Sequence, residues 1–303
     1  MMNYAFYTAD VFTNQIFGGN PLAVFPQADG LTPDLMQKIA AEINYSETVF
    51  VLPPTTPQGT RRLRIFTPQA ELPFAGHPTI GTTFVLAAIA EIPLVDAETT
   101  IYLEEGVGIV PVTIHSQAGQ PIYSELRAAQ LPEFGPEPPA IPLLAELLSL
   151  QPAQILTGEY YPQAVSCGLP FLFIPLSDQQ ALNQARLKLD LWEKFLRDYW
   201  ASSLYLFTLD STVPGLDFHA RMFAPGLGVP EDPATGSAAT ALGGYFAQRQ
   251  VGDGQWVWHG EQGRLMGRPS HLTIKVQQVN QVIQAIAVGG ASVLVSQGTM
   301  TIG

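Results

Sequence analysis

Four polar residues of this sequence are candidates for proton-transfer chemistry, because each stands next to an apolar or glycine-containing segment. Glu47 precedes the apolar run at residues 49–52, where removal from water would favour a protonated acid that can shuttle a hydrogen. His77 lies at the junction of a turn and an expected helix, where the helix dipole favours the neutral imidazole. Asp232 and Ser237 flank a second turn of this kind, and together they offer a carboxylate, a hydroxyl group and a backbone N–H.

Each of these residues also has a purely structural interpretation. The carboxylate of Glu47 is also typical of a helix end or a turn in water, and His77 of a capping or core histidine. Asp232 fits an N-terminal helix cap, and a serine such as Ser237 is common at helix starts for capping alone. Only their joint placement at two similar turns favours a functional site.

The two turns belong to an internal repeat. Residues 64–68 (Arg-Ile-Phe-Thr-Pro) recur as residues 221–225 (Arg-Met-Phe-Ala-Pro), an offset of 157 that also carries Pro73 onto Pro230. Each copy continues into a turn that contains Gly76 or Gly236, and then into an apolar helix. Such a helix start presents backbone N–H groups and the positive end of the helix dipole to an anion. Two related halves that face each other could therefore hold one small anionic substrate.

The elements that must position these residues follow the same order in both halves. Aromatic and β-branched runs predict strands, and each half also contains a helix that is apolar on all sides and must therefore be enclosed. In the first half we expect strands at 4–12, 21–25, 48–52 and 62–66, and helices at 33–44 and 78–92. In the second half we expect strands at 171–176, 203–209 and 217–223, and helices within 178–199 and at 237–248. The pattern predicts sheets wrapped around one central helix in each half.

A proline-rich stretch lies near the expected linker between the halves. Residues 131–139 contain four prolines, which cannot sit inside a central strand or helix. We expect one domain at residues 1–117 and a second at residues 118–291. A last strand at about 292–303 is expected to cross back to the first half.

Composition and charge limit the partners of the protein. The chain of 303 residues is 47% hydrophobic and carries a formal charge of −12, which repels nucleic acid and anionic lipid. Its N-terminal residues lack the basic start and long apolar core of a signal peptide or spanning helix. We therefore expect a cytoplasmic protein with no nucleic-acid or membrane partner.

The cysteine count excludes several chemistries. Cys167 is the single cysteine, so the chain has no intrachain disulfide, no thiolate metal cluster and no reaction that needs two thiols. The sequence also lacks glycine-rich dinucleotide and phosphate motifs, a Gly-x-Ser-x-Gly elbow and a histidine pair at metal-binding spacing. We expect neither a metal nor an organic cofactor.

Four ordered blocks resemble the signature blocks of the PhzF phenazine-biosynthesis-like isomerases, and the resemblance runs nearly end to end. The blocks are residues 12–25 (Phe-Thr-Asn, then Gly-Gly-Asn-Pro-Leu-Ala-Val-Phe from 18), 44–50 (Asn-Tyr-Ser-Glu-Thr-Val-Phe), 72–79 (Leu-Pro-Phe-Ala-Gly-His-Pro-Thr) and 231–239 (Glu-Asp-Pro-Ala-Thr-Gly-Ser-Ala-Ala). The resemblance implies the α+β, diaminopimelate-epimerase-like fold. In that fold two pseudo-symmetric domains, each a barrel-like and mostly antiparallel sheet around a central helix, enclose the site in the cleft between them.

The resemblance also implies roles for residues at matching positions. The founding members isomerise a dihydro-hydroxyanthranilate without a cofactor, by moving a hydrogen between ring carbons. By resemblance, Glu47 is the proton shuttle, assisted by His77, Asp232 and Ser237. The resemblance also implies that four further residues of these blocks contact the substrate. They are Asn20, Ser46 and, through their backbone, Gly76 and Gly236.

Three functions agree with these observations. The first is a cofactor-independent isomerase that shifts a hydrogen within a small carboxylate-bearing cyclic or unsaturated metabolite. The second is an amino-acid epimerase or racemase that uses Glu47 with His77 or Asp232 in place of thiols. The third is a protein that binds a small anion or a partner without catalysis. Since the family often dimerises, we also expect a homodimer. Family membership does not identify the substrate.

Overall fold

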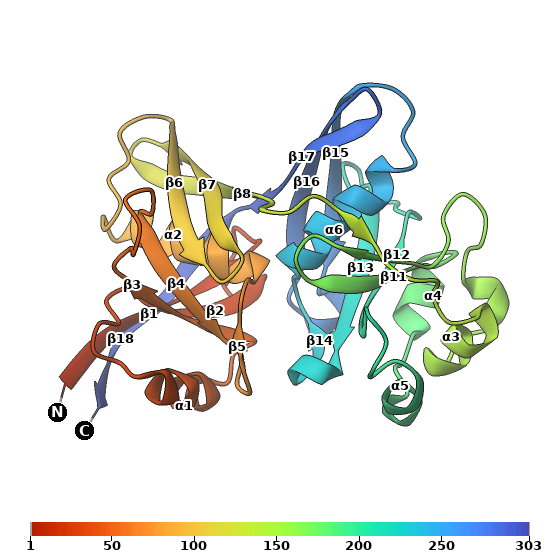
Figure 1. Ribbon diagram of the computed structural model, residues 1–303, viewed down its shortest axis with the longest axis horizontal. Coiled ribbons are helices and arrows are strands. Elements are labelled where there is room, and N and C mark those ends of the chain that lie inside the picture. Colours follow the sequence, from red (N-terminus) through yellow and green to blue (C-terminus); the bar gives the residue numbers. More distant parts are fainter. Residues whose placement is uncertain (1, 303) are drawn as a thin grey trace. The chain divides into compact units, whose positions relative to one another are not determined.

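The computed structural model describes residues 2–302 and divides into two compact units (Figure 1). The first unit runs up to Ala129 and resumes at Ala287, and the second unit comprises Gln130–Ile286. The boundary expected after residue 117 is therefore too early. Strand β8 (Gln120–Arg127) forms a hairpin with β7 (Gly108–Gln117), so it belongs to the first unit.

The first unit contains a sheet in which antiparallel pairs alternate with two parallel steps. Strand β1 pairs antiparallel with β2 and β18, β2 pairs parallel with β3, β3 antiparallel with β4, β4 parallel with β6, and β6 antiparallel with β7. The short β5 pairs with β4, and β8 pairs with the end of β17. The bounds are β1 (Met2–Val11), β2 (Asn20–Phe25), β3 (Glu47–Leu52), β4 (Arg61–Phe66), β5 (Glu71–Leu72), β6 (Glu98–Glu105), β17 (Val282–Gly290) and β18 (Ser292–Ile302).

Helix α2 (Gly76–Ala88) is the central helix of the first unit. It contains no charged residue, and all of its residues up to Ala87 are buried, so it must be enclosed on every side. It packs against β1, β2, β3, β7, β8 and β18. At Gly81 a Cβ atom would lie 2.4 Å from Val11 Cγ2, so the helix approaches β1 closely. This is the barrel-like arrangement that the sequence predicts.

Helix α1 (Pro33–Ile43) covers one side of the same sheet. Thr32 caps it by accepting a hydrogen bond from the Leu35 N–H at 3.3 Å, and Pro33 occupies the first helical position. Its apolar face, which includes Met36, packs in a core cluster with aromatic side chains of β2, β3 and β4. The helix ends at Asn44, which adopts the left-handed conformation at φ 55°.

The second unit repeats the strand order of the first. Strand β10 pairs antiparallel with β9 and β11, β11 parallel with β12, β12 antiparallel with β13, β13 parallel with β15, and β15 antiparallel with β16. The short β14 pairs with β13, as β5 pairs with β4. The bounds are β9 (Glu133–Phe134), β10 (Gln163–Ser166), β11 (Pro170–Pro175), β12 (Ser203–Thr208), β13 (Phe218–Ala224), β14 (Val229–Asp232), β15 (Gly254–Gln262) and β16 (Ser270–Val279).

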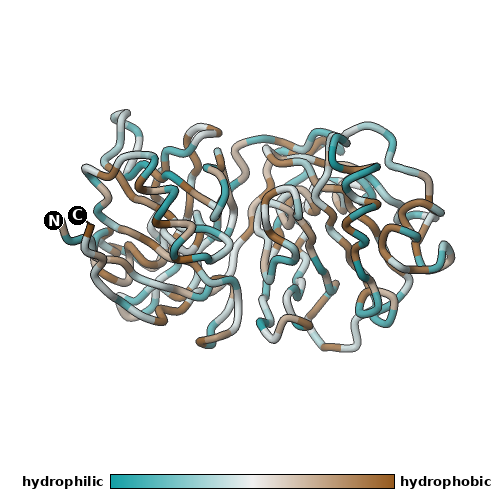
Figure 2. The backbone as a smooth tube through the Cα atoms, turned by 90° about the horizontal axis from the view of Figure 1, so that it is seen from below, coloured by the Kyte–Doolittle hydropathy of each residue, from teal (hydrophilic) through white to brown (hydrophobic). Residues whose placement is uncertain are grey.

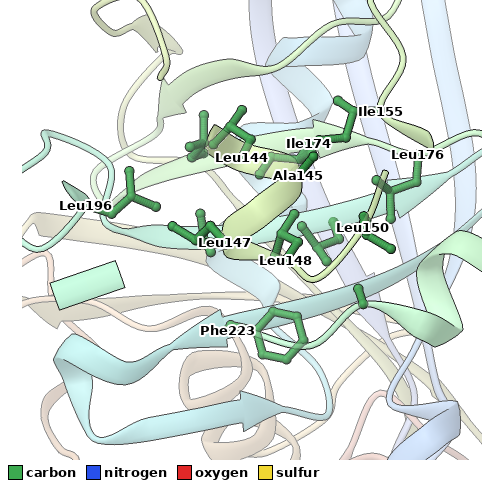
Figure 3. Packing of buried hydrophobic residues seen from close by; sticks show 14 of the residues in the cluster. Leu144, Ala145, Leu147, Leu148, Leu150, Ile155, Ile174, Leu176, Leu196 and Phe223 are labelled. Carbon is green, nitrogen blue, oxygen red and sulfur yellow. The ribbon is translucent and has the colours of Figure 1, made fainter. Parts of the chain in front are cut away.

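Helix α6 (Gly236–Ala247) is the buried central helix of the second unit and packs against β10, β11 and β16. Three further helices extend this unit: α3 (Ile141–Leu147), α4 (Gln179–Gln184) and α5 (Leu189–Phe195). Figure 3 shows Leu144, Leu147 and Leu148 in the core cluster that they form with the strands, near Ile174 and Phe223. Short 3₁₀ helices lie at Pro152–Gln154, Pro225–Leu227 and Arg264–Met266.

The strand registers show that the repeat offset changes between the sheet and the helix. Ile65 pairs with Leu72, whereas Met222 pairs with Asp232, so the offset grows from 157 (222 − 65) to 160 (232 − 72). The 3₁₀ helix at Pro225–Leu227 lies in the connection that contains the three extra residues. Asp232 therefore corresponds to Leu72, and Pro73 corresponds to Pro233 rather than to Pro230. The two central helices begin at equivalent glycines.

The chain ends meet in the first unit. Met2 pairs with Ile302, and the antiparallel register continues to Val11 and Ser292 with one shift after Thr8. Figure 2 shows the N- and C-terminal strands side by side, and hydrophobic stretches along the strands and helices of each unit. Among residues 2–302, no helix is both long enough and apolar enough to cross a membrane.

Gly19 fixes the backbone just before β2. It adopts φ +60°, and a Cβ atom at this position would lie 2.3 Å from the carbonyl oxygen of Val11. Only glycine tolerates both the left-handed backbone and this approach. Because Asn20 is the first residue of β2, Gly19 also determines where the Asn20 side chain lies.

We predict that Gly19→Ala lowers the free energy of unfolding by roughly 2–4 kcal/mol, since it combines backbone strain with a clash against backbone. Gly119→Ala is the matched control, because Gly119 has φ +74° but nothing lies within 4 Å of its Cβ position. The control should cost only about 1 kcal/mol. Denaturant unfolding of both variants measures the difference. Equal losses would show that the Val11 contact does not constrain the turn.

Candidate functional site

Three side chains converge where two parallel strands and the central helix of the first unit begin. Asn20 is the first residue of β2, Glu47 the first residue of β3, and His77 the second residue of α2. Leu22 lies opposite Glu47 in the parallel pair, so both strands start at the same edge of the sheet. Glu47 Oε2 lies 3.4 Å from His77 Nε2, and Asn20 Nδ2 lies 3.2 Å from His77 Nδ1.

The position of Glu47 follows from the way α1 ends. Asn44 reverses the chain, and only Tyr45 and Ser46 separate it from β3. Glu47 is therefore a strand residue and not a helix-end residue in water, and its side chain is only 13% exposed. Of the two interpretations that the sequence allows, the structure agrees with a largely buried acid beside a polar partner.

The imidazole of His77 is neutral at physiological pH. Burial lowers its pKa from 6.5 to about 3, and a hydrogen bond at the Pro21 backbone acts in the opposite direction. The contact with Glu47 is therefore not an ion pair. Where the Asn20 amide nitrogen donates to Nδ1, the ring proton lies on Nε2 and faces the carboxylate of Glu47.

The start of α2 provides a site that favours negative charge. The residue before the helix, Ala75, has no side chain that could cap it, and Pro78 lacks an N–H. The Thr79 N–H already donates to the Ala75 carbonyl at 3.2 Å. The N–H groups of Gly76 and His77 thus lie at the positive end of a buried helix, next to Glu47.

Glu105 is a buried acid of the first unit that the sequence analysis does not identify. It ends β6, and its Oε1 lies 2.7 Å from Thr79 Oγ1 on the first turn of α2. Its Oε2 is inaccessible to solvent and has no hydrogen-bond partner among the described residues. Burial raises the pKa of Glu105 to about 8, against the effect of the Thr79 hydrogen bond. A neutral Glu105 adds no negative charge beside the helix start.

The second unit places Asp232 and Ser237 near the start of α6. Asp232 ends β14 and is 5% exposed, and its Oδ2 accepts a hydrogen bond from Thr235 Oγ1 at 2.6 Å. The Gln262 side chain donates to the Asp232 carbonyl at 2.7 Å and to Thr235 Oγ1 at 3.0 Å. Ser237 is the second residue of α6, after Gly236, and is buried. Thr235 and Gln262 are thus further polar residues of this cluster.

The strand registers show that the acid of β3 has no counterpart in the second unit. Thr48 pairs with Phe66 as Leu204 pairs with Phe223, so the residue that corresponds to Glu47 is Ser203. Ser203 is also the first residue of its strand. The equivalent of His77, at the second position of the other central helix, is Ser237.

Neither thiol chemistry nor a metal site is apparent in the part of the chain that the structure describes. Burial raises the pKa of Cys167 to about 12, so this thiol is a poor nucleophile. Residues 2–302 contain no group of three or more His, Cys, Asp or Glu side chains arranged to hold a metal ion.

The chain is similar to known proteins over nearly its whole length. The model of the PhzC-PhzF family, described as phenazine biosynthesis-like protein, matches residues 9–298. An uncharacterized isomerase of Mesorhizobium japonicum is 37% identical, with 99% of each chain covered. The trans-2,3-dihydro-3-hydroxyanthranilate isomerase of Pseudomonas aeruginosa is 33% identical over 97% of this chain and 98% of the relative.

A solved structure has the same fold. The crystal structure of a Bacillus anthracis phenazine biosynthesis protein of the PhzF family superposes with a TM-score of 0.88, with both chains covered completely. The sequence identity is 24%, so this likeness concerns the fold alone. It confirms the α+β class and the diaminopimelate-epimerase-like architecture that the sequence resemblance implies.

We predict that Glu105→Gln flattens part of the pH dependence of stability. Native Glu105 keeps its proton up to about pH 8, whereas the unfolded chain loses it near the model value of 4.5, so the wild type loses stability as pH rises through this window. Between these pH values, the free energy of unfolding of the wild type should fall by roughly 2–4 kcal/mol relative to that of the variant.

Urea unfolding at several pH values measures this difference. Glu98→Gln is the matched control, because Glu98 lies on the same strand with a side chain that is 68% exposed. Parallel curves for the wild type and Glu105→Gln would show that Glu105 is already ionised in the native protein.

Proposed function

Because this chain belongs to the family of phenazine biosynthesis-like proteins, which includes named isomerases, we propose that it is a cofactor-independent isomerase. Its substrate would be a small carboxylate-bearing cyclic or unsaturated metabolite, similar to a dihydro-hydroxyanthranilate. The observation that carries the proposal is the contact of Glu47 with the neutral His77 at the start of α2.

The proposed reaction is a hydrogen shift by one acid. The carboxylate of Glu47 removes a proton from a substrate carbon, and the C–H electron pair enters the unsaturated system of the substrate. The protonated Glu47 then returns the proton to a different carbon, which restores the carboxylate. No electron leaves the substrate, so the cycle needs no redox partner.

The other residues would support this shuttle. The N–H groups of Gly76 and His77 suit the substrate carboxylate, and the Nε2–H of His77 would orient Glu47. We propose Asn20 and Ser46 as substrate contacts, Asp232 and Ser237 as assisting groups, and Gly236 as a further backbone donor. A two-thiol epimerase is excluded, because the one cysteine of the sequence lies at neither helix start.

Glu47→Gln should slow both the isomerisation of the substrate and the incorporation of solvent hydrogen into the product. In deuterated water with trans-2,3-dihydro-3-hydroxyanthranilate, the wild type should give isomerised product, and the variant should be slower by about 10²–10⁴-fold, because an amide cannot carry the proton. Mass spectrometry and NMR measure product and deuterium. Glu98→Gln, on the exposed side of β6, controls for a general effect of removing a carboxylate.

Two results would contradict this proposal. Equal turnover by the wild type and Glu47→Gln would remove Glu47 from the shuttle role. Ligands that bind equally well to both proteins, without product from any of them, would favour a binding protein over an enzyme.

We further propose that the isomerase acts in the cytoplasm as a homodimer. Light scattering of the purified protein should then give twice the chain mass of 32.8 kDa. A mass near that of one chain would contradict the homodimer.

A further inference from the structure

The second unit contains a large cavity that none of the candidate site residues lines. It lies between α4, α5, the β13–β14 connection and the 3₁₀ helix at Arg264–Met266, and its volume is about 720 Å³. This volume is in the range of pockets that hold small organic ligands, about 300–1,000 Å³. The proposed isomerase reaction gives this cavity no role.

Two aromatic side chains form a rigid wall of the cavity. Trp192 and Phe223 are both 5% exposed and belong to the core cluster of this unit. The Trp192 indole is held by a hydrogen bond from Nε1 to the Ser202 carbonyl at 2.8 Å. Leu189 and Leu265, which also line the cavity, are each 51% exposed. The wall is therefore preorganised, and the rim combines these two leucines with exposed polar residues, which are Asn183, Arg186 and Glu193.

One ion pair in the cavity wall is already satisfied. Arg221 donates from Nε and Nη2 to the two carboxylate oxygens of Glu231, at 2.8 and 2.9 Å. Its Nη1 donates to the carbonyls of Leu182 and Ala185, which lie at the end of α4. The guanidinium also covers one face of Phe223, at 4.8 Å from the ring centroid. Because its charges are already paired, this part of the cavity wall offers no free charge to a ligand.

Arg186 offers the charge that the Arg221 pair does not. Arg186 is exposed, and its Nη1 donates to the carbonyls of Asn183 and Ala185, both at 2.8 Å, which restrains the guanidinium at the cavity rim. Its Nε and Nη2 form no hydrogen bond within residues 2–302. These two nitrogens form the edge of the guanidinium that can donate two parallel hydrogen bonds to a carboxylate. Glu193, an exposed acid that also lines the cavity, would weaken the binding of an anion.

We propose that this cavity is a second binding site, for a planar aromatic monocarboxylate. The ring would lie against Leu189 and Leu265, over the small exposed parts of Trp192 and Phe223, and the carboxylate would accept two hydrogen bonds from the Nε and Nη2 edge of Arg186. A mostly apolar cavity with one guanidinium at its rim matches a small molecule that has one apolar face and one carboxylate.

The test follows the Trp192 indole N–H by NMR during titration with 2-naphthoate. The full chain is labelled with ¹⁵N, and Trp192→Phe identifies the signal among the four tryptophans. The wild-type signal should shift and saturate with a dissociation constant below about 1 mM. Because the indole belongs to a residue that lines the cavity, the signal should respond most to a probe bound there, and the charge variants below test that location.

Two charge variants should change the affinity in opposite directions. Arg186→Gln should weaken 2-naphthoate binding at least about tenfold, because the two charge-assisted hydrogen bonds are lost. Glu193→Gln should strengthen it about two- to fivefold, because a like charge is removed. The neutral 2-naphthamide should bind both variants and the wild type within about twofold of one another.

Three results would overturn the proposal. These are a Trp192 signal that does not respond to 2-naphthoate, equal affinities of the wild type and Arg186→Gln, and an unchanged or weaker affinity in Glu193→Gln. A second copy of the chain would occupy the cavity instead if two results are found together. These are a wild-type Trp192 signal that does not respond to 2-naphthoate, and a dimer that the Leu189→Asp substitution dissociates.

Discussion

The burial of the His77 ring is the constraint on which the charge distribution at the start of α2 depends. A protonated imidazole would pair with Glu47 and make its carboxylate a weaker base. The neutral ring instead provides a polar contact and places no positive charge beside this carboxylate. Neutral Glu105, on the far end of a hydrogen bond to Thr79, keeps the helix start free of a competing negative charge. Burial thus determines the charge of both His77 and Glu105.

The two units have the same strand order but carry different functional groups at equivalent positions. The first residue of the second parallel strand is Glu47 in one unit and Ser203 in the other. The second residue of the central helix is His77 or Ser237, and the carboxylate of Asp232 replaces the apolar Leu72. The two units therefore share the backbone that presents a helix start and differ in the side chains that surround it. That both helix starts serve one ligand stays a prediction.

The elements that periodicity and capping define could be predicted from the sequence, and the two buried helices are the clearest cases. The boundary at residue 117 is wrong because Ala118 and Gly119, both at positive φ, form a hairpin turn that resembles a linker. The register change near Pro225 could not be seen, because a short 3₁₀ turn leaves no periodic signal. Glu105 was missed because two acids before a glycine are typical of an exposed turn. Its burial arises only when the β6–β7 hairpin packs against Pro73 and Thr79.

The pairing of β1 with β18 has a consequence for the order of assembly. The second unit, Gln130–Ile286, is continuous in sequence, so all of its strands are available before the C-terminal segment is synthesised. The barrel around α2 lacks one of its strands until residues 292–302 leave the ribosome. The half that contains Glu47 and His77 is translated first but can close only last. During this interval the edge of β1 is exposed and able to pair with other chains.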